Sequence, residues 1–414
     1  MSVSEKAALL AAVEQDRNEI IDFFRGLVRI KTPNPPGDTR EAAAYIGKFL
    51  TAEGLGFRTV APMAEYPNLI ASFDASQPGR HLVLNGHIDV FPVDPIGWTQ
   101  DPWGGALVDG KIYGRGACDM KAGTTASIFT YRYLSRIREK LKGKLTLTCV
   151  SDEETFGPWG ARYLIEHRPE VHGDCLLNGE PSGTNTIRFG EKGPLWLAFT
   201  VTTPGAHGAY THLSASATKI AGRLIADLET LTELPAAAPD NIVRALEQAA
   251  PAVDQAMGAG ASLIVPKVTL NVGMMTGGLK VNMVPGQCRI EADIRLPLGI
   301  DKETIMKEVR KIVSRYPGVV VEEINFNPPS YCDPYGEMVE ILQTNARQLS
   351  GIEPVPIVSL GGTDARLWRY RNIPAYVYGP PPVGMGSCDE HVGVDDFLHV
   401  VRTHVLSAYD YLTR

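Results

Sequence analysis

Three apolar runs in the first half of the chain end shortly before residues of the kind that bind metal ions. The runs occupy residues 81–85, 145–150 and 171–178, and helical patterns lie between them. Alternation of buried strands with helices predicts an α/β domain whose mixed sheet is covered by helices on both faces. Because ligands of open α/β sheets gather at the carboxyl ends of strands, we expect a functional site where these runs end.

The pattern changes near residue 190, which predicts a second domain. The expected elements are strands at 195–201, 267–272 and 287–295 and a helix at 214–231. Between them, an Ala- and Pro-rich segment at 235–266 favours no element. A chain of 414 residues is long enough for two domains. We therefore expect a small α+β domain at 191–300, inserted between the two parts of a catalytic domain, 1–190 and 301–414.

Composition excludes several classes of protein. The formal charge of −7 favours neither nucleic acid nor an anionic membrane surface as a partner. No apolar run is long enough for a transmembrane helix, and residues 1–6 lack the start of a signal peptide. Six scattered cysteines form no Cys-x-x-Cys pair, so we expect Cys149 and Cys175 to be buried apolar residues. These features predict a cytoplasmic protein that acts on a small molecule.

His87, Asp89 and Asp119 follow the first apolar run. In an extended chain, residues i and i+2 share a face, so Asp89 can orient the imidazole of His87 as a carboxylate does in many metal sites. The alternative is a structural His–Asp pair. Asp119 follows Gly114 and Gly116, where the backbone can approach a ligand closely. Its alternative is a turn or a helix N-cap.

Glu153 and Glu154 are adjacent carboxylates, which repel each other and normally need a cation in a buried place. If Glu154 binds a metal ion, Glu153 is free to act as a general base toward water whose pKa the ion lowers. An acidic surface loop is the alternative. Glu180 and His391 complete a set of two imidazoles and three carboxylates. Such a set suits two divalent ions sharing one carboxylate, with zinc expected first and cobalt or manganese as alternatives.

Other catalytic motifs are broken in this chain. Residues 384–388 depart from the Gly-x-Ser-x-Gly pattern of a serine nucleophile. Residues 105–111 have the glycine and lysine spacing of a phosphate-binding loop, but Ile112 stands where Ser or Thr is required. The metal-ligand set is therefore the motif that carries the prediction of function.

With these residues, the chain resembles the di-zinc family of acetylornithine deacetylase, succinyl-diaminopimelate desuccinylase, aminoacylase and glutamate carboxypeptidase over essentially its whole length. The matching segments are 85–90, 114–123, 152–154, 179–182, 361–366 and 390–391. The resemblance implies a cis peptide between Asp119 and Met120. It also implies that Asp119 bridges the two ions. His87 and Glu180 would bind one ion, and Glu154 and His391 would bind the other. Glu153 would be the general base, and Asp89 would orient His87.

The resemblance also implies that residues 191–300 form a lid and the interface of a homodimer. His207 would stabilise the oxyanion in the partner subunit's site, and Asn282 would contact the substrate nearby. Arg295 would bind a substrate carboxylate, for which a guanidinium is geometrically suited. The alternatives are a surface histidine and a structural arginine.

Further substrate contacts are expected on two loops. Gly362 and Thr363 match a loop that lines the pocket in the family. Tyr210 and His212 extend the His207 loop and would suit an aromatic or apolar group. The arginine-rich stretch of the family's desuccinylases is missing at 189–196, which argues against succinyl-diaminopimelate as the substrate.

The resulting prediction is a metal-dependent hydrolase that cleaves an amide C–N bond in an N-acyl amino acid or short peptide with a free carboxylate. Hydrolytic deamination of a non-peptide amine, aromatic amines included, is the alternative at the same two-metal site. A catalytically inactive binding protein on the same fold is the alternative from another class, and the retention of all five ligands and Glu153 argues against it.

Overall fold

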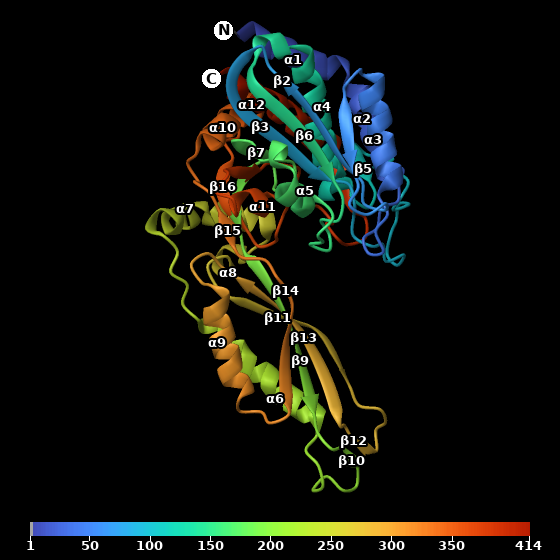
Figure 1. Cartoon of the computed structure of the whole chain (residues 1–414), viewed down its shortest axis with the longest axis vertical. Coiled ribbons are helices and arrows are strands. Elements are labelled where there is room, and N and C mark those ends of the chain that lie inside the picture. The colour runs from blue at the N-terminus through green and yellow to red at the C-terminus, as the bar shows by residue number, and fades with distance from the viewer. Residues whose placement is uncertain (1–2) are drawn as a thin grey trace. The chain divides into compact units, whose positions relative to one another are not determined.

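The computed structural model describes residues 3–414, and Met1 and Ser2 of the N-terminal segment considered above lie outside the described residues. The chain divides into two compact units (Figure 1). One unit comprises the chain up to Phe189 together with Cys332–Ile357 and Thr363–Arg414, and the other comprises Gly190–Tyr331 and Val358–Gly362. The insertion therefore begins where the sequence pattern changes.

The first unit is built on a mixed sheet and a small second sheet. Its strands are β1 (Phe57–Val60), β2 (Asn68–Asp74), β3 (Gln77–His87), β4 (Ala106–Val108), β5 (Lys111–Tyr113), β6 (Lys142–Val150), β7 (Cys175–Asn178), β8 (Thr186–Glu191), β16 (Val355–Ser359), β17 (Ala375–Val377) and β18 (His391–Gly393). The main sheet has the order β1-β2-β6-β3-β7-β17-β8, with β16 also paired to β8, and the small sheet has the order β18-β5-β4. β3 runs parallel to β6 and β7, so its carboxyl end meets theirs at one edge of the sheet.

Helices cover both faces of the main sheet, as predicted. They are α1 (Val3–Gln15), α2 (Arg17–Arg29), α3 (Arg40–Ala52), α4 (Ala122–Arg136), α5 (Ala161–His167), α10 (Glu337–Ser350), α11 (Ala365–Arg369) and α12 (Val394–Thr413), with short turns at η1 (Ala117–Lys121), η2 (Arg138–Lys140) and η3 (Pro169–Val171). α4 and α12 pack against each other and against β3 and β6. Gly86 of β3 faces Thr124 of α4, whereas Val83 joins Trp368 of α11 in a buried cluster on the opposite face.

A buried histidine ties α12 to the segment that follows β17. His404 is fully buried, and its Nε2–H donates to the main-chain oxygen of Tyr378 at 2.6 Å. Its Nδ1 is buried and has no hydrogen-bond partner among residues 3–414. Burial lowers the pKa of His404 to about 4, so the folded chain holds this ring neutral.

We expect His404 to make the folded chain less stable as the pH falls. Because the folded-state pKa lies below the unfolded value of 6.5, the unfolded chain binds more protons between pH 6.5 and 4. His404 should therefore cost about 3 kcal/mol of unfolding free energy over that interval. Urea unfolding at several pH values should give a shallower acid dependence for His404→Gln than for the wild type. His167→Gln, on an exposed part of α5, is the control, and equal slopes for wild type and His404→Gln would contradict the prediction.

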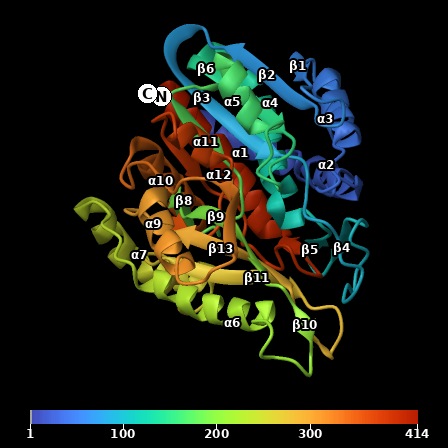
Figure 2. The same ribbon diagram turned by 60° about the horizontal axis from the view of Figure 1, so that its bottom comes forward.

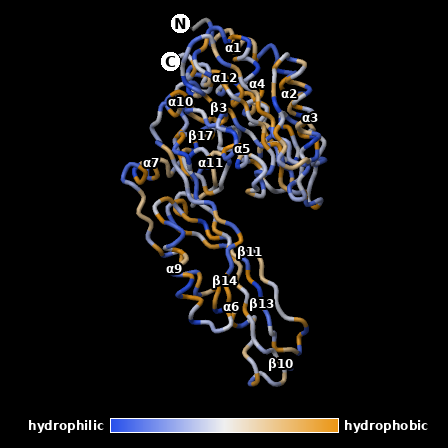
Figure 3. The backbone as a smooth tube through the Cα atoms, viewed as in Figure 1, coloured by the Kyte–Doolittle hydropathy of each residue, from blue (hydrophilic) through white to orange (hydrophobic). Residues whose placement is uncertain are grey.

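The second unit is built on a four-stranded antiparallel sheet. Its elements are β9 (Gly193–Thr202), β10 (Ala206–His207), α6 (Ala217–Leu228), η4 (Glu229–Glu233), α7 (Asp240–Met257), α8 (Ala261–Ile264), β11 (Thr269–Gly277), β12 (Met283–Val284), β13 (Gln287–Leu296), α9 (Lys302–Val313), β14 (Val319–Phe326) and β15 (Ser330–Tyr331). The sheet order is β11-β13-β9-β14, and β10 pairs separately with β12. α6 and α9 pack together on this sheet (Figure 2), and both show hydrophobic and hydrophilic residues in alternation (Figure 3).

The second unit extends beyond residue 300, where the sequence pattern had placed its end. β14 pairs along β9 and completes the sheet. α9 begins at an N-cap, Asp301, whose carboxylate accepts a hydrogen bond from the main-chain nitrogen of Thr304 at 2.8 Å. Ile305 and Val309 of α9 lie in the buried core of this unit. Residues 302–331 therefore belong with the insertion, because their apolar side chains and strand pairing are satisfied there.

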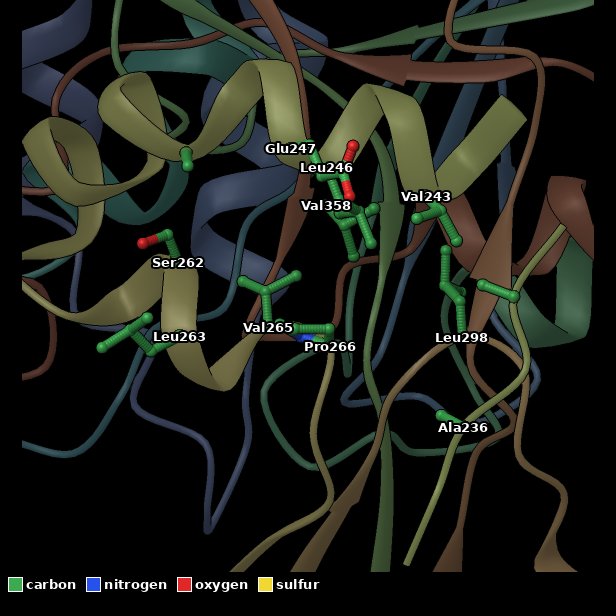
Figure 4. Close-up of a pocket in the computed structure, with 12 residues that line it drawn as sticks. Ala236, Val243, Leu246, Glu247, Ser262, Leu263, Val265, Pro266, Leu298 and Val358 are labelled. Carbon is green, nitrogen blue, oxygen red and sulfur yellow. The ribbon is translucent and has the colours of Figure 1, made fainter. Parts of the chain in front are cut away.

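The segment 235–266, which favoured no element in sequence, folds mainly as α7 and α8. Ile242, Ala245, Ala249 and Val253 are the buried residues of α7, and their helical spacing explains the element in spite of Pro251. The two helices line an apolar pocket of about 320 Å³ (Figure 4). The pocket lies wholly within the second unit.

Two further predictions concern cysteines and membranes. All six cysteines are free, and Cys149 and Cys175 are buried, as predicted. Within residues 3–414, no helix has both the length and the apolar character needed to cross a bilayer. A cytoplasmic location stays a prediction.

Candidate metal centre

His87 lies at the middle of a group of carboxylates in the first unit. It is the last residue of β3 and is 1 % exposed. Nδ1 lies 2.9 Å from the main-chain oxygen of Asp89, and because a carbonyl oxygen only accepts, Nδ1 carries a proton. Nε2 lies 3.2 Å from Asp119 Oδ1 and 3.3 Å from Glu180 Oε1. The ring is thus fixed with its second nitrogen directed at two carboxylates.

The ligand-type atoms of this region form two groups of three. His87, Asp119 and Glu154 make one group, His87, Glu153 and Glu180 make the other, and the atoms of each lie within 4.8 Å of one another. Glu154 Oε1 is buried and has no hydrogen-bond partner among the described residues. A buried carboxylate oxygen without a donor normally requires a cation. The residues present therefore fit divalent metal ions.

Crowding changes the ionisation of the carboxyl groups. Burial, followed by the charge of Asp364, raises the pKa of Glu153 well above its usual value. Burial and the charge of Asp119 do the same to Glu154, and they raise the pKa of Glu180 to about 7. The cluster carries more negative charge than its own side chains offset, which is the condition that a bound cation relieves.

The ionisation of His87 responds in the opposite sense. Burial alone lowers the pKa of His87, but Glu180, Asp119 and Asp89 together raise it well above its usual value. Burial works to raise the pKa of Asp119, and the hydrogen bond from His87 outweighs it, so the pKa of Asp119 is lowered. The imidazole of His87 is therefore surrounded by oxygen atoms that accept hydrogen bonds.

Asp89 connects His87 to Glu153 and Glu154. Its carboxylate accepts hydrogen bonds from the main-chain nitrogens of Glu153 at 3.3 Å and Glu154 at 3.1 Å, and from Asn34 Nδ2 at 2.9 Å. The carboxylate lies 3.6 Å from Nδ1 of His87, too far for a hydrogen bond. The hydrogen bond that holds the ring comes from the main-chain oxygen of Asp89, whereas the sequence had suggested its carboxylate.

Close backbone contacts position Glu180 and Asp119. A Cβ on Gly123, at the start of α4, would lie 1.9 Å from the main-chain oxygen of Gly179, so only glycine allows the helix to approach the loop before Glu180. Asp119 lies in η1, and its peptide bond to Met120 is cis, as the resemblance implied.

Glu153 has a buried cationic neighbour that the sequence prediction did not include. Arg366 Nη1 donates to Glu153 Oε1 at 3.3 Å, and both side chains are buried. Arg366 also donates to the main-chain oxygen of Thr363. This contact restrains the carboxylate that is expected to act as the general base.

His391 is not brought into this cluster. Within residues 3–414 it belongs to neither group of ligand-type atoms. Its ring lies 4.8 Å from the ring of Tyr113, and its Nδ1 donates to the main-chain oxygen of Asp389 at 2.8 Å. Ligation by His391, which the resemblance implies, stays a prediction.

Four predicted substrate contacts lie together in the second unit. His207 is exposed, and its Nδ1 accepts from the main-chain nitrogen of Ala209 at 3.2 Å. Asn282 adjoins it, because the main-chain oxygen of Asn282 accepts from Gly208 at 2.7 Å. The ring of Tyr210 lies 5.7 Å from that of His207 and 6.2 Å from that of His212. The structure thus forms one exposed cluster of these side chains.

The remaining predicted contacts have local partners. Arg295 Nε donates to Asp293, which also accepts from Trp196 Nε1, so Arg295 has the structural pairing that was its alternative. Thr363 is buried and Gly362 is half-buried. No signal in the sequence marks Asn34 or Arg366 as neighbours of Asp89 and Glu153, because each is brought there from a distant segment.

Comparisons with known proteins agree with the resemblance. A family model described as peptidase family M20/M25/M40 matches residues 83–410. The chain is 24% identical over 403 residues to succinyl-diaminopimelate desuccinylase 2 of Ruegeria sp. strain TM1040, with 94% of each chain covered. It is 29% identical over 359 residues to the succinyl-diaminopimelate desuccinylase of Cereibacter sphaeroides strain ATCC 17029, with 83% of this chain and 87% of the relative covered.

Solved structures share the fold. An M20 family metallo-carboxypeptidase from Sulfolobus solfataricus superposes with a TM-score of 0.81 at 18% identity, covering 96% of this chain and 100% of the other. A dinuclear metal-binding peptidase of the M20 family from Bacillus subtilis gives a TM-score of 0.67 at 16% identity, covering 96% and 99%. The chain therefore belongs to peptidase family M20/M25/M40 and is a hydrolytic enzyme of the metallo-amidohydrolase type.

Proposed function

We propose that this chain hydrolyses an amide C–N bond in an N-acyl amino acid or a short peptide with a free carboxylate. Two divalent ions, of zinc, cobalt or manganese, would be held by His87, Asp119, Glu154, Glu180 and His391. The observation that carries the proposal is the place of Glu153. Its carboxylate lies in one group of ligand-type atoms, while its neighbour Glu154 lies in the other.

Divalent ions in such a centre polarise a carbonyl group and lower the pKa of water. Glu153 takes the proton from the attacking water and returns it to the nitrogen of the leaving amine, so that the C–N bond breaks with no net change in proton number. Burial raises the pKa of Glu153, which suits a group that holds a proton between these two steps. Arg366 keeps its carboxylate in place.

The names of the similar proteins support this class of substrate. A desuccinylase removes an acyl group from an amine, and a carboxypeptidase cleaves the bond next to a free carboxylate. The proposed substrates have in common an amide bond near a carboxylate. Arg295 is our candidate for binding that carboxylate, because Asp293 engages only its Nε among the described residues.

We also propose a homodimer in which His207 and Asn282 act in the partner subunit's site. β11 is an edge strand of its sheet, and it exposes Met274 and Met275. Exposed apolar residues on the edge strand of a sheet favour association with a second copy. Because Nδ1 of His207 accepts a hydrogen bond, its proton is on Nε2, which therefore offers a donor for a developing oxyanion.

A screen of N-acyl amino acids and dipeptides tests the substrate class. With zinc, cobalt or manganese added, we expect turnover of at least one compound, loss of turnover after chelation and recovery when the metal is restored. Glu166→Gln, on the exposed part of α5, serves as a control and should retain activity. Release of ammonia from an aromatic amine, without turnover of any acyl amino acid or dipeptide, would instead favour deamination.

A further inference from the structure

The ring of His391 is held by a main-chain oxygen in the same way as the ring of His87. Nδ1 of His391 lies 2.8 Å from the main-chain oxygen of Asp389, and Nδ1 of His87 lies 2.9 Å from that of Asp89. Because a carbonyl oxygen only accepts, Nδ1 carries the proton of each neutral ring. Nε2 is then the nitrogen that can bind a metal ion.

Asp389 adopts an uncommon backbone conformation. Its φ angle is 53°, in the left-handed region, which Asp tolerates better than most residues but which is otherwise typical of glycine. In this conformation the main-chain oxygen of Asp389 receives the Nδ1–H of His391. Contacts that hold residue 389 in the left-handed region therefore also hold the imidazole.

The carboxylate of Asp389 makes such contacts with a second loop. Oδ1 accepts hydrogen bonds from the main-chain nitrogens of Thr99 at 2.8 Å and Gln100 at 3.4 Å. Oδ2 accepts from Oγ1 of Thr99 at 2.9 Å. We call these three hydrogen bonds the Asp389 clasp. The clasp joins the segment before His391 to a loop about 290 positions earlier in the chain.

The loop that receives the clasp is anchored next to the loop of Asp119. The guanidinium of Arg115 lies 5.5 Å from the ring centroid of Trp98, and it is buried and paired with the carboxylate of Glu390. Oε1 of Glu390 also accepts hydrogen bonds from the main-chain nitrogens of Cys118 at 3.0 Å and Asp119 at 3.2 Å. The clasp therefore ends on a loop that has its own buried anchor.

We propose that Asp389 is a positioning residue for His391. Its carboxylate holds residue 389 against Thr99, and its main-chain oxygen thereby fixes the imidazole with Nε2 left for a metal ion. This inference rests on the metal-dependent function proposed above, with His391 as a ligand.

The Asp389 clasp should act on one of the two ions only. In the proposed centre, His391 and Glu154 serve one ion, whereas His87 serves the other. The ring of His87 is held by Asp89 and does not depend on the clasp. Loss of the clasp should therefore weaken the ion bound by His391 and leave the other ion unchanged.

Titration of the metal-free protein with Zn²⁺ in the presence of a competing chelator tests this expectation. Asp389→Gly removes the clasp but keeps the main-chain oxygen, and glycine adopts a positive φ without strain. We expect one ion to bind about 10-fold or more weakly and the other to stay within about twofold of the wild type. Asp389→Asn keeps an acceptor for Thr99 and tolerates the same conformation, so it should retain both affinities within about threefold.

Two further variants make the titration specific. His391→Ala identifies the ion that depends on His391, and Asp389→Gly should weaken the same ion. Asp301→Gly is the matched control, because Asp301 also accepts a main-chain hydrogen bond, from Thr304 at 2.8 Å, but lies in the second unit. It should bind both ions as the wild type does. Unchanged affinities in Asp389→Gly, or equal weakening of both ions in a variant that circular dichroism shows to be folded, would overturn the inference.

The position of the proton on His391 gives a readout that needs neither metal nor substrate. NMR of the metal-free protein with ¹⁵N-labelled histidine, at an alkaline pH where the rings are neutral, distinguishes the Nδ1–H and Nε2–H forms. The signals of His391 are those that disappear in His391→Ala. We expect the Nδ1–H form in the wild type and a mixture of both forms in Asp389→Gly. The Nε2–H form in the wild type, or the same populations in both proteins, would also overturn the positioning role.

These experiments separate the inference from the proposed function. A substrate screen without turnover, together with the expected titrations and NMR spectra, would sink only the proposed reaction. A wild type that bound fewer than two ions would contradict the proposed metal centre, and the NMR comparison would still decide whether Asp389 holds the ring of His391.

Discussion

Glu153→Gln should lower kcat by about 10³-fold while the protein keeps its metal ions. The substitution preserves the shape of the side chain and its contact with Arg366, 3.3 Å away, but removes the group that accepts the proton. Loss of general acid–base catalysis costs about 10²- to 10⁴-fold, and the adjacent Glu154 is needed as a ligand. Steady-state kinetics on the best substrate of the screen gives kcat and KM, and atomic emission gives the metal content.

The control for this variant is Glu166→Gln, because Glu166 is exposed on α5 and belongs to neither group of ligand-type atoms. It should match the wild type in both measurements. If Glu153→Gln retained a tenth of the activity, proton transfer would have to run through another group. If it lost metal instead, Glu153 would be a ligand and the base would be elsewhere.

His207→Ala should lower kcat by about 10²- to 10³-fold, the usual cost of removing a donor to an oxyanion. His207 is exposed and fixed by the main chain of Ala209, so its removal disturbs little of the second unit. If His207 acts in the partner subunit's site, mixed dimers of His207→Ala and Glu153→Gln contain one site with both groups intact. Random mixing of subunits should then recover about a quarter of the wild-type activity.

The mixing experiment needs subunit exchange, which co-expression of the two variants with different tags provides. Each variant expressed with a second copy of itself is the control and should stay inactive. Analytical ultracentrifugation reports whether a dimer forms at all. A dimer that recovers no activity would place the action of His207 within its own subunit, and a monomer with full activity would contradict the dimer.

The ligands that were predicted from sequence and found together are those that directly follow a buried strand or lie next to a glycine-rich loop. His87 is the last residue of β3 and Glu154 follows the end of its parallel neighbour β6, so the pattern of apolar runs was enough to bring them to one edge of the sheet. Glu390 was not among the predicted site residues, because its hydrogen bonds to the main-chain nitrogens of Cys118 and Asp119 join segments that are far apart in the sequence.

The parts that sequence reasoning missed depend on contacts between distant segments. Asn34 reaches Asp89 across 55 positions, and Arg366 reaches Glu153 across 213. Neither residue belongs to a local pattern that would indicate its partner. The end of the inserted unit was misplaced for a similar reason. β14 belongs to this unit because it pairs with β9, and its own composition does not indicate that pairing.

The hydrogen bonds of Glu390 to the loop of Asp119 have a consequence for how the protein is made. Cys118 and Asp119 are joined to Glu390 across 272 and 271 positions. At a synthesis rate of about 5–20 residues per second, the ribosome finishes the loop roughly 15–50 s before it reaches the glutamate that holds it. During that interval the nascent chain already contains most of the metal-ligand residues, but the loop of Asp119 lacks its hydrogen bonds to Glu390. A fully braced centre can therefore exist only after residue 390 has been made, so the loop of Asp119 must wait for that residue before it reaches its final hydrogen bonding.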